Sequence, residues 1–421
     1  MARKRKDTGE QGPVQGKWDL PAGWEWKRLG EICPANRKKI QPATKPELPY
    51  IGMEHIEPYT GMQCGQDIFG HMKSAGVHFF PGDVLYGRLR PYLSKVFLAR
   101  QEGACSPEFI VFEENNNLSN KYIVYFLRSG DFVNFASHPD NTSGERPRID
   151  YATIAAHPIP LPPSLQDQKR IVERIDSLFA ELDKAEETLR HTITLCEQYK
   201  QSVLKAAVTG ELSKEWRKAN NKKWNIKKLK DALLEVITGP FGSALHKEDY
   251  ICGGIPVINP VHIQCRKIIP SDKMTISKSK ADSMARYYME NGDIVIARRG
   301  DMGRCAPVHH AGFFCGTGSM ILRPKVNINN EFLAMAISSD QTIQYLNKKC
   351  VGTTMKNLNQ GILLEAQIPL PCSDEQNYII KIVNGSLLEN THFEKKCEQL
   401  LNMYKALRQS ILKQAFTGQL I

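Results

Sequence analysis

The side chains best suited to bind a ligand are arginines that follow two short apolar segments. Residues 84–86 lead through Gly87 to Arg88 and Arg90, and residues 294–297 lead to Arg298, Arg299 and Arg304. The turn Pro-Gly-Asp and the alternation after it predict a strand that places Arg88 and Arg90 on one face. A guanidinium group pairs in a bidentate manner with phosphate oxygens and guanine edges. These arginines are therefore candidate nucleic-acid contacts, and for each the alternative is an ordinary surface salt bridge.

Polar segments that we predict to be flexible loops supply further candidates for phosphate or base contacts. Two of them, residues 142–149 and 351–358, each precede a final Ile-Pro-Leu-Pro segment. The candidates on predicted loops are Lys73, Ser143, Arg146, Arg148, Thr353, Lys356 and Asn357.

No catalytic motif is present in the sequence. There is no GxxxxGK[ST] loop for ATP, no GxGxxG after a strand, and no Asn/Asp-Pro-Pro-aromatic tetrapeptide of an adenine methyltransferase. The segment Asn259-Pro260-Val261-His262 lacks the second proline and the aromatic ring. Glu394-Lys395-Lys396 and Asp167-Gln168-Lys169 have nuclease-like spacing, but both fall on predicted long helices, away from any cleft. We therefore predict no catalytic residue in this chain.

Two histidines, His55 and His262, occupy equivalent positions in the two halves of the chain. The simpler interpretation is a loop histidine that caps or packs, and the alternative is a contact in a nucleic-acid groove. No second ligand follows either histidine at metal-binding spacing, so we predict no metal site.

Charge and cysteine usage restrict the class of protein. The formal net charge is +11, which favours a polyanionic partner. The 11 cysteines include no CxxC pair, as expected for reduced thiols in a cytoplasmic protein. No apolar run has the length of a membrane span, and the N-terminal residues do not resemble a secretory signal. The cluster Arg3-Lys4-Arg5-Lys6 is either a nucleic-acid-binding arm or a solvated tail.

The chain contains a duplication that must position these residues. Residues 159–212 and 368–420 each begin with Ile-Pro-Leu-Pro, continue as a long helical pattern, and end with Thr-Gly-x-Leu. A Trp-rich basic segment opens each half, at Trp24 and at Trp224. In both long segments apolar residues recur at alternating steps of four and three, which predicts coiled-coil helices. Each helix of about 45 residues would be roughly 65–70 Å long.

These patterns predict an α+β fold with a pseudo-two-fold repeat. The two long helices pair in an antiparallel coiled coil, because each is the simplest cover for the apolar seam of the other. In this arrangement the C-terminus lies near Trp24. Matching strands are expected at 109–112 and 319–322, and matching helices at 120–127 and 330–337. The predicted regions are a disordered basic arm (1–20), a first globular domain (21–158), a first long helix (159–212), a linker with a second globular domain (213–367) and a second long helix (368–421).

The duplicated helix boundaries resemble those of the specificity subunit of type I restriction–modification systems. The resemblance covers nearly the whole chain and is strongest at residues 159–172, 202–212, 368–383 and 410–420; Asn377-Tyr378 departs from the charged Lys169-Arg170 of the first copy. It implies that each globular segment is a target recognition domain for one half of a bipartite double-stranded DNA sequence. It also implies that the helices set the spacing between half-sites and dock two methyltransferase (modification) subunits. S-adenosylmethionine would belong to those subunits, and ATP and Mg²⁺ to motor-nuclease (restriction) subunits.

Two other classes of protein remain as alternatives. A coiled-coil scaffold whose globular ends bind proteins would explain the helices but not two divergent, basic, loop-rich domains. A stand-alone nuclease or methyltransferase is disfavoured by the missing motifs.

Overall fold

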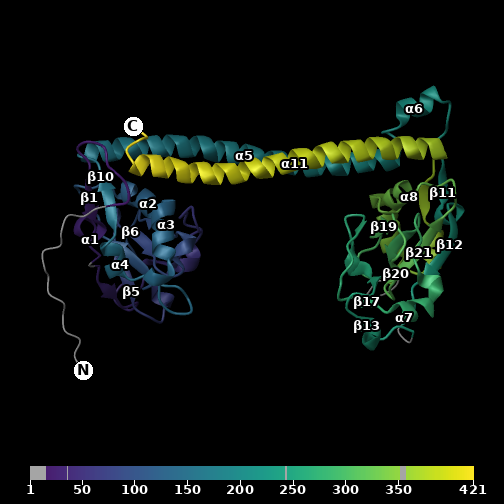
Figure 1. Ribbon diagram of the computed structural model, residues 1–421, viewed down its shortest axis with the longest axis horizontal. Coiled ribbons are helices and arrows are strands. Elements are labelled where there is room, and N and C mark those ends of the chain that lie inside the picture. Colours follow the sequence, from purple (N-terminus) through teal and green to yellow (C-terminus); the bar gives the residue numbers. More distant parts are fainter. Residues whose placement is uncertain (1–15, 36, 242–243, 351–356) are drawn as a thin grey trace. The chain divides into compact units, whose positions relative to one another are not determined.

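The computed structural model describes residues 16–421 except 36, 242–243 and 351–356, so the basic cluster at residues 3–6 lies outside the described residues. The chain forms two compact units (Figure 1). Unit 1 comprises Met1–Arg190 and Glu398–Ile421, and unit 2 comprises His191–Cys397. Each unit therefore contains one globular region together with a part of each long helix.

The globular region of unit 1 is built on small sheets. A five-stranded sheet has the order β2-β5-β8-β3-β4, a three-stranded sheet has the order β7-β6-β9, and β1 pairs with β10. The strands are β1 (Glu25–Arg28), β2 (Lys39–Ile40), β3 (Pro49–Ile51), β4 (Asp67–Ile68), β5 (Gly76–Phe79), β6 (Val84–Gly87), β7 (Val96–Leu98), β8 (Gly103–Cys105), β9 (Phe109–Phe112) and β10 (Pro158–Leu161). The helices are α1 (Leu29–Ile32), α2 (Asn120–Arg128), α3 (Gly130–Ser137), α4 (Tyr151–Ala155) and the long α5 (Leu165–Thr209).

The globular region of unit 2 is built in a related way. One four-stranded sheet has the order β12-β21-β18-β19, a second has the order β13-β17-β14-β20, and β11 pairs with β22. The strands are β11 (Ile226–Lys228), β12 (Leu233–Thr238), β13 (Tyr250–Ile251), β14 (Ile255–Ile258), β15 (Ile263–Gln264), β16 (Lys267–Ile268), β17 (Thr275–Ile276), β18 (Ile294–Ala297), β19 (Cys305–Pro307), β20 (Phe314–Cys315), β21 (Ser319–Pro324) and β22 (Gln367–Pro369). The helices are α6 (Lys214–Ala219), α7 (Lys278–Asp282), α8 (Asn330–Ile337), α9 (Asp340–Lys349), α10 (Gln360–Leu364) and the long α11 (Ser373–Phe416).

The predicted α+β repeat is confirmed element by element. Strands β9 and β21 and helices α2 and α8 lie where the matching patterns placed them. Each Ile-Pro-Leu-Pro segment forms a strand that pairs with the basic segment opening its half, as β10 with β1 and β22 with β11. The long helices contain 45 and 44 residues.

The repeated Thr-Gly-x-Leu motif ends each long helix for a local reason. Thr209 Oγ1 donates to Lys205 O, and Thr417 Oγ1 donates to Lys413 O, both at 3.0 Å. The following glycines, Gly210 and Gly418, have φ angles of +82° and +70°. This left-handed conformation at the end of a helix favours glycine because it has no Cβ.

The predicted approach of the C-terminus to the start of the first repeat is confirmed within unit 1. Trp18 Nε1 donates to Phe416 O at 3.4 Å. A Cβ built on Gly418 would lie 2.2 Å from Pro21 Cγ, so the segment around Pro21 packs closely against the end of the second long helix. Trp24 and Leu420 pack against the same apolar core.

Contacts between the two long helices within each unit fit an antiparallel pairing. In unit 1, Arg408 Nη2 donates to Asp183 Oδ1 at 2.6 Å. In unit 2, Lys200 Nζ donates to Glu394 Oε2 at 2.6 Å, and Asn390 Nδ2 donates to Cys196 O at 2.9 Å. Further along α5 in unit 2, Val203 and Ala207 share an apolar core with Ile379 and Val383, which come earlier in α11 than Asn390 and Glu394, as an antiparallel pair requires.

The predicted seams of the helices are only half correct. Each seam contains two positions of the heptad repeat, and the residues at one of them are buried. They are Ile175, Leu182, Cys196 and Val203 in α5 and Val383, Asn390, Cys397 and Ile411 in α11. The other position is largely open, and its exposed members are Tyr199, Phe393, Leu400 and Leu407. A helix with a single helical neighbour buries only the narrow stripe that faces it.

A buried aspartate supports the turn before the arginine-bearing strand in each half. Asp83 Oδ2 accepts from Phe80 N–H and Asp293 Oδ2 accepts from Glu290 N–H, both at 2.8 Å. Each carboxylate also receives two guanidinium bonds, from Arg37 for Asp83 and from Arg323 for Asp293. The two aspartates therefore fix where β6 and β18 begin.

None of the helices in the described part of the chain is long and apolar enough to cross a membrane.

Candidate nucleic-acid interface

Arg88 and Arg298 occupy the same backbone position in the two halves. Arg88 N–H donates to Glu108 O and Arg298 N–H donates to Gly318 O, both at 2.9 Å. The carbonyl of Arg88 accepts from Ile149 N–H at 3.1 Å, and that of Arg298 accepts from Leu358 N–H at 2.8 Å. Each arginine is thereby held between the start of the last core strand and a polar loop that differs in sequence between the halves.

The prediction that one strand presents Arg88 and Arg90 on one face is wrong. Strand β6 ends at Gly87, and all four of its residues are buried. Both faces of the strand are covered, so the sequence reads as an apolar run and not as an alternation. Arg90 lies beyond the strand in the left-handed conformation, with φ +53°, and its side chain is exposed.

Arg88 lies half-buried against the loop that contains Ser143, Arg146 and Arg148. Its Nε atom is buried and has no hydrogen-bond partner among the described residues. Arg148 is held differently, because its Nε and Nη2 atoms donate to the Glu108 carboxylate at 3.1 and 2.9 Å. Arg148 is therefore held in a salt bridge, whereas Arg88 retains an unused donor among the described residues.

Arg298 is also half-buried and is held by a polar side chain. Its Nε atom donates to Asn357 Oδ1 at 3.3 Å, and a short β-bridge joins Arg299 to Asn357. Burial, followed by the neighbouring charge of Arg299, lowers the pKa of Arg298 from its usual value. Two adjacent cations at the end of one strand favour a bound anion.

The remaining predicted contacts fall into three groups. Arg304 is paired with Asp301 and donates from Nη1 to Pro260 O at 3.2 Å. Lys73, Ser143 and Arg146 are exposed on loops. Thr353 and Lys356 lie outside the described residues.

The surroundings of Arg298 differ from those of Arg88 in a way that spacing alone does not show. Gly316 and Gly318 stand where the first half has Ser106 and Glu108. A Cβ on Gly316 would lie 2.2 Å from Asn259 Oδ1, so the missing side chain lets Asn259 pack against this backbone. The site in unit 2 is thus shaped by Asn259 and glycines and lacks the carboxylate that Glu108 supplies in unit 1.

Several exposed aromatic side chains near these loops were not predicted from the sequence. Tyr92 follows Arg90 by two residues and is 45% exposed, and Tyr59, 66% exposed, donates its backbone N–H to Leu93 O. Phe241 is 67% exposed in the second half. Each of them directly follows a proline in the sequence, which is the pattern that could have identified them. Exposed aromatic side chains of this kind stack on bases.

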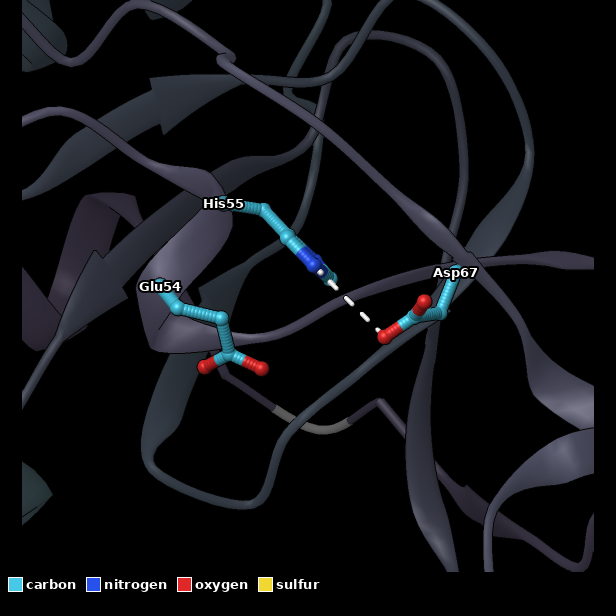
Figure 2. Close-up of side chains that lie close together, drawn as sticks. All are labelled: Glu54, His55 and Asp67. Atoms are coloured by element: carbon cyan, nitrogen blue, oxygen red, sulfur yellow. Dashed lines mark ion pairs between the residues drawn. The ribbon is translucent and has the colours of Figure 1, made fainter. Parts of the chain in front are cut away.

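His55 and His262 have the capping role that was the simpler interpretation. His55 Nδ1 accepts from Gly52 N–H and His262 Nδ1 accepts from Asn259 N–H, both at 3.0 Å. Figure 2 shows His55 between Glu54 and Asp67, with its Nε2 3.6 Å from Asp67 Oδ2. These three residues form a possible metal-ligand group. However, an Nδ1 that accepts a hydrogen bond leaves the proton of a neutral ring on Nε2, the only nitrogen that faces the acids. This arrangement disfavours a metal ion at the group.

The sequence comparison identifies the family. Residues 21–195 and 221–402 match the family described as type I restriction modification DNA specificity domain. The chain belongs to this family. The two matched segments correspond to the two halves of the repeat.

Curated relatives are specificity subunits of type I restriction enzymes. The EcoBI specificity subunit of Escherichia coli is 28% identical over 365 residues, which are 82% of this chain and 75% of the relative. The StySPI specificity subunit of Salmonella potsdam is 26% identical, over 76% of this chain and 68% of the relative. The EcoDI specificity subunit of Escherichia coli is 29% identical, but the match spans only 48% of this chain and 45% of the relative.

Solved structures show the same fold. A chain of a type I R-M system aligns over 96% of this chain and 100% of its own length, with a TM-score of 0.74 and 20% identity. The HsdS subunit from Thermoanaerobacter tengcongensis aligns over 96% of this chain and 99% of its own length, with a TM-score of 0.63 and 20% identity.

Proposed function

We propose that this chain is the DNA-specificity subunit of a type I restriction–modification enzyme. Each globular region would read one half of a bipartite double-stranded DNA target. The observation that carries the proposal is the repeated position of Arg88 and Arg298, which have the same backbone contacts and different neighbouring loops. Two protein sites with the same backbone framework and different surface loops suit two different DNA half-sites.

The chemistry of these sites suits the two kinds of contact that specific DNA binding needs. Exposed cations such as Lys73, Arg90 and Arg146 suit phosphate contacts, which supply affinity that falls with salt. The half-buried Arg88 and Arg298, which form no ion pair in the described part of the chain, suit guanine edges in the major groove. Exposed Tyr59, Tyr92 and Phe241 add stacking surfaces for DNA whose target adenine leaves the helix.

The chain would act without catalytic residues of its own. Its expected partners are two modification subunits, which would bind S-adenosylmethionine, and motor-nuclease restriction subunits, which would use ATP and Mg²⁺. The open seam position of the long helices supports docking of such subunits, because Tyr199, Phe393, Leu400 and Leu407 are between 38% and 51% exposed. Exposed apolar residues that recur along one helix favour a protein partner.

A methylation assay tests the proposal. The chain is purified with its modification subunit and given random-sequence duplexes with S-adenosylmethionine, and methylated adenines are mapped by sequencing. We expect a single bipartite motif with a fixed spacer. Methylation without a motif, or a motif that does not change when this chain is exchanged for another specificity subunit, would contradict the proposal.

A further inference from the structure

A cleft of about 650 Å³ lies in unit 1. Its walls are one face of α2, the end of β7 and the loop of residues 60–66. The cations on its lining are Arg100, Lys121 and Arg128, and no acidic residue lines it in the described part of the chain. Gln63, Gln66 and Tyr125 add polar groups to a wall that is otherwise largely apolar.

The carboxylate of Asp176 contacts two residues that line the cleft. Its Oδ2 accepts from Lys121 Nζ at 2.6 Å, and its Oδ1 accepts from the Tyr125 hydroxyl. Asp176 therefore pairs with Lys121 and not with Arg128.

Arg128 is a largely buried cation of the cleft on which no carboxylate among the described residues acts. Its Nη2 donates to Val96 O at 2.5 Å, while its Nε is buried without a hydrogen-bond partner. Burial lowers the pKa of Arg128 to about 10, so the group remains charged at neutral pH. A buried cation without a counter-ion is costly, and an anion placed beside it recovers part of that cost.

Close packing of the loop holds this guanidinium in place. Gly61 has φ +62°, and a Cβ there would lie 1.9 Å from Arg128 Nη2 and 2.0 Å from Val96 O. The loop thus approaches the charge only because residue 61 has no side chain.

The equivalent region of unit 2 balances its charges internally. Helix α8 repeats α2 at an offset of 210 residues, so Glu331 stands in place of Lys121 and Ser338 in place of Arg128. The cation there is Arg266, at the turn between β15 and β16, and Glu331 contributes to its electrostatic environment. In unit 2, Glu331 therefore acts on Arg266, whereas in unit 1 no carboxylate among the described residues acts on Arg128.

We propose that the cleft of unit 1 binds a small organic anion, whose carboxylate or phosphate pairs with Arg128 and Arg100 while its apolar part lies against Phe97, Leu98 and Val124. A planar guanidinium pairs with either oxyanion in a bidentate manner. Two of the three cations of this cleft are not repeated in unit 2, where Lys121 and Arg128 align with Glu331 and Ser338.

Calorimetric titration of the full chain tests the site with defined probes. Phenyl phosphate and benzoate represent the two oxyanion sources, inorganic phosphate lacks the apolar part, and phenol lacks the charge. We expect one of the two organic anions to bind at one site per chain, at least tenfold more tightly than phenol or inorganic phosphate. Arg128→Gln should weaken this binding at least tenfold.

Two further variants separate a lost site from a lost fold. Arg100→Gln changes an exposed residue at the cleft and should weaken binding about threefold with an unchanged melting temperature. Arg266→Gln, the matched change in unit 2, should leave binding unchanged.

Three outcomes would overturn the proposal. They are no binding by the wild-type chain, equal binding of phenol, and binding that neither Arg128→Gln nor Arg100→Gln weakens. If Arg128→Gln weakens binding of non-target duplex DNA while no small anion binds, the cleft is instead a contact for the DNA backbone.

Discussion

At the scale of the residue, what separates the candidate DNA contacts is whether their hydrogen-bonding groups are already used. Arg148 and Arg304 are paired with the carboxylates of Glu108 and Asp301. Arg88 and Arg298 are half-buried and paired with no carboxylate in the described part of the chain. An arginine that is positioned by its backbone and has free donors is prepared to read a base edge at little cost in side-chain entropy.

Replacing Arg298 with alanine should relax recognition of one half-site only. The loss of a bidentate base contact should cost about 1–3 kcal/mol at the position it reads. Methylation profiling on duplexes with single substitutions in each half-site measures the effect.

Arg88→Ala is the matched variant and should relax the other half-site. Equal loss of discrimination in both halves with either variant would show that the two regions do not read independently.

His157 gives a pH-dependent stability. Its ring lies 4.0 Å from that of Phe135, centroid to centroid, and burial lowers its pKa to about 4. The unfolded histidine titrates near its usual value of about 6.5, so between these values the unfolded state binds the proton. The stabilising contribution is therefore complete above pH 6.5 and is lost as the pH falls toward 4.

When the pH falls from 7.5 to 5, protonation of this residue in the unfolded state should lower the free energy of unfolding by roughly 2 kcal/mol. Urea unfolding of the wild type and of His157→Gln at both pH values measures it, and the difference between the two pH values should be smaller in the variant. An equal pH dependence in the two proteins would show that His157 is not the group that titrates.

The sequence revealed the residues of the sites only where a local pattern marked them. The arginines were found because they follow an apolar run within a few residues. The roles of Asn259, Gly316 and Glu108 were not found, because they come from contacts between segments that are distant in sequence. The unbalanced charge of Arg128 depends on the absence of an acid in space, which no spacing encodes.

At the scale of the element, the helices and core strands were predictable because their periodicity is long and repeated. Helix α8 has the predicted bounds, and α2 is longer by one residue. The strand before Arg88 was misjudged because a run buried on both faces carries no alternation. The seams were half correct because a heptad pattern shows which residues are apolar but not how many neighbours cover them.

Asn390 is a polar residue in the buried stripe of the helix pair. We expect it to lower the stability of the protein and to fix the register of the two helices. It is 9% exposed, and its side-chain amide bonds to Cys196 O. A polar group at such a position restricts the register of paired helices at a cost in stability. Asn390→Leu should raise the free energy of unfolding by about 1 kcal/mol, through added apolar burial.

Urea unfolding measures that change, and methylation of duplexes with spacers shortened or lengthened by one base pair measures the register. We expect the variant to accept more than one spacer. Thr391→Leu, at the next and exposed position, should alter neither property. A less stable Asn390→Leu variant would show that the amide contributes more through its hydrogen bond than it costs by its burial.

At the scale of the whole molecule, the same arrangement of elements occurs twice, and membership of the specificity-domain family suggests why. The repeated parts are those that must be the same in both halves: the strand entering each long helix, the Thr-Gly helix end, the buried aspartate and the arginine backbone position. The parts that differ are the loops beside Arg88 and Arg298 and the charge pattern of α2 and α8. This division fits a scaffold held constant for assembly and surfaces free to vary with the target.

If the long helices set the spacing of the half-sites, lengthening both of them should lengthen the DNA spacer without changing the bases that are read. The boundary between the two units falls after Arg190 in α5 and after Cys397 in α11. One added heptad at each place preserves the phase of the buried stripe and adds about 10 Å of helix. At about 3.4 Å per base pair, this length corresponds to roughly three additional base pairs. Methylation mapping on duplexes whose half-sites are separated by every spacer within five base pairs of the original gives the permitted length.

A heptad inserted in α5 alone is the control for that experiment, because it breaks the pairing of the helices and should abolish methylation at every spacer. The paired insertion is expected to move the optimum and to keep both half-sites, since Arg88, Arg298 and their loops are untouched. An unchanged spacer in an active double insertion would show that the helices do not act as the ruler and that the spacing is set by the subunits that dock on them.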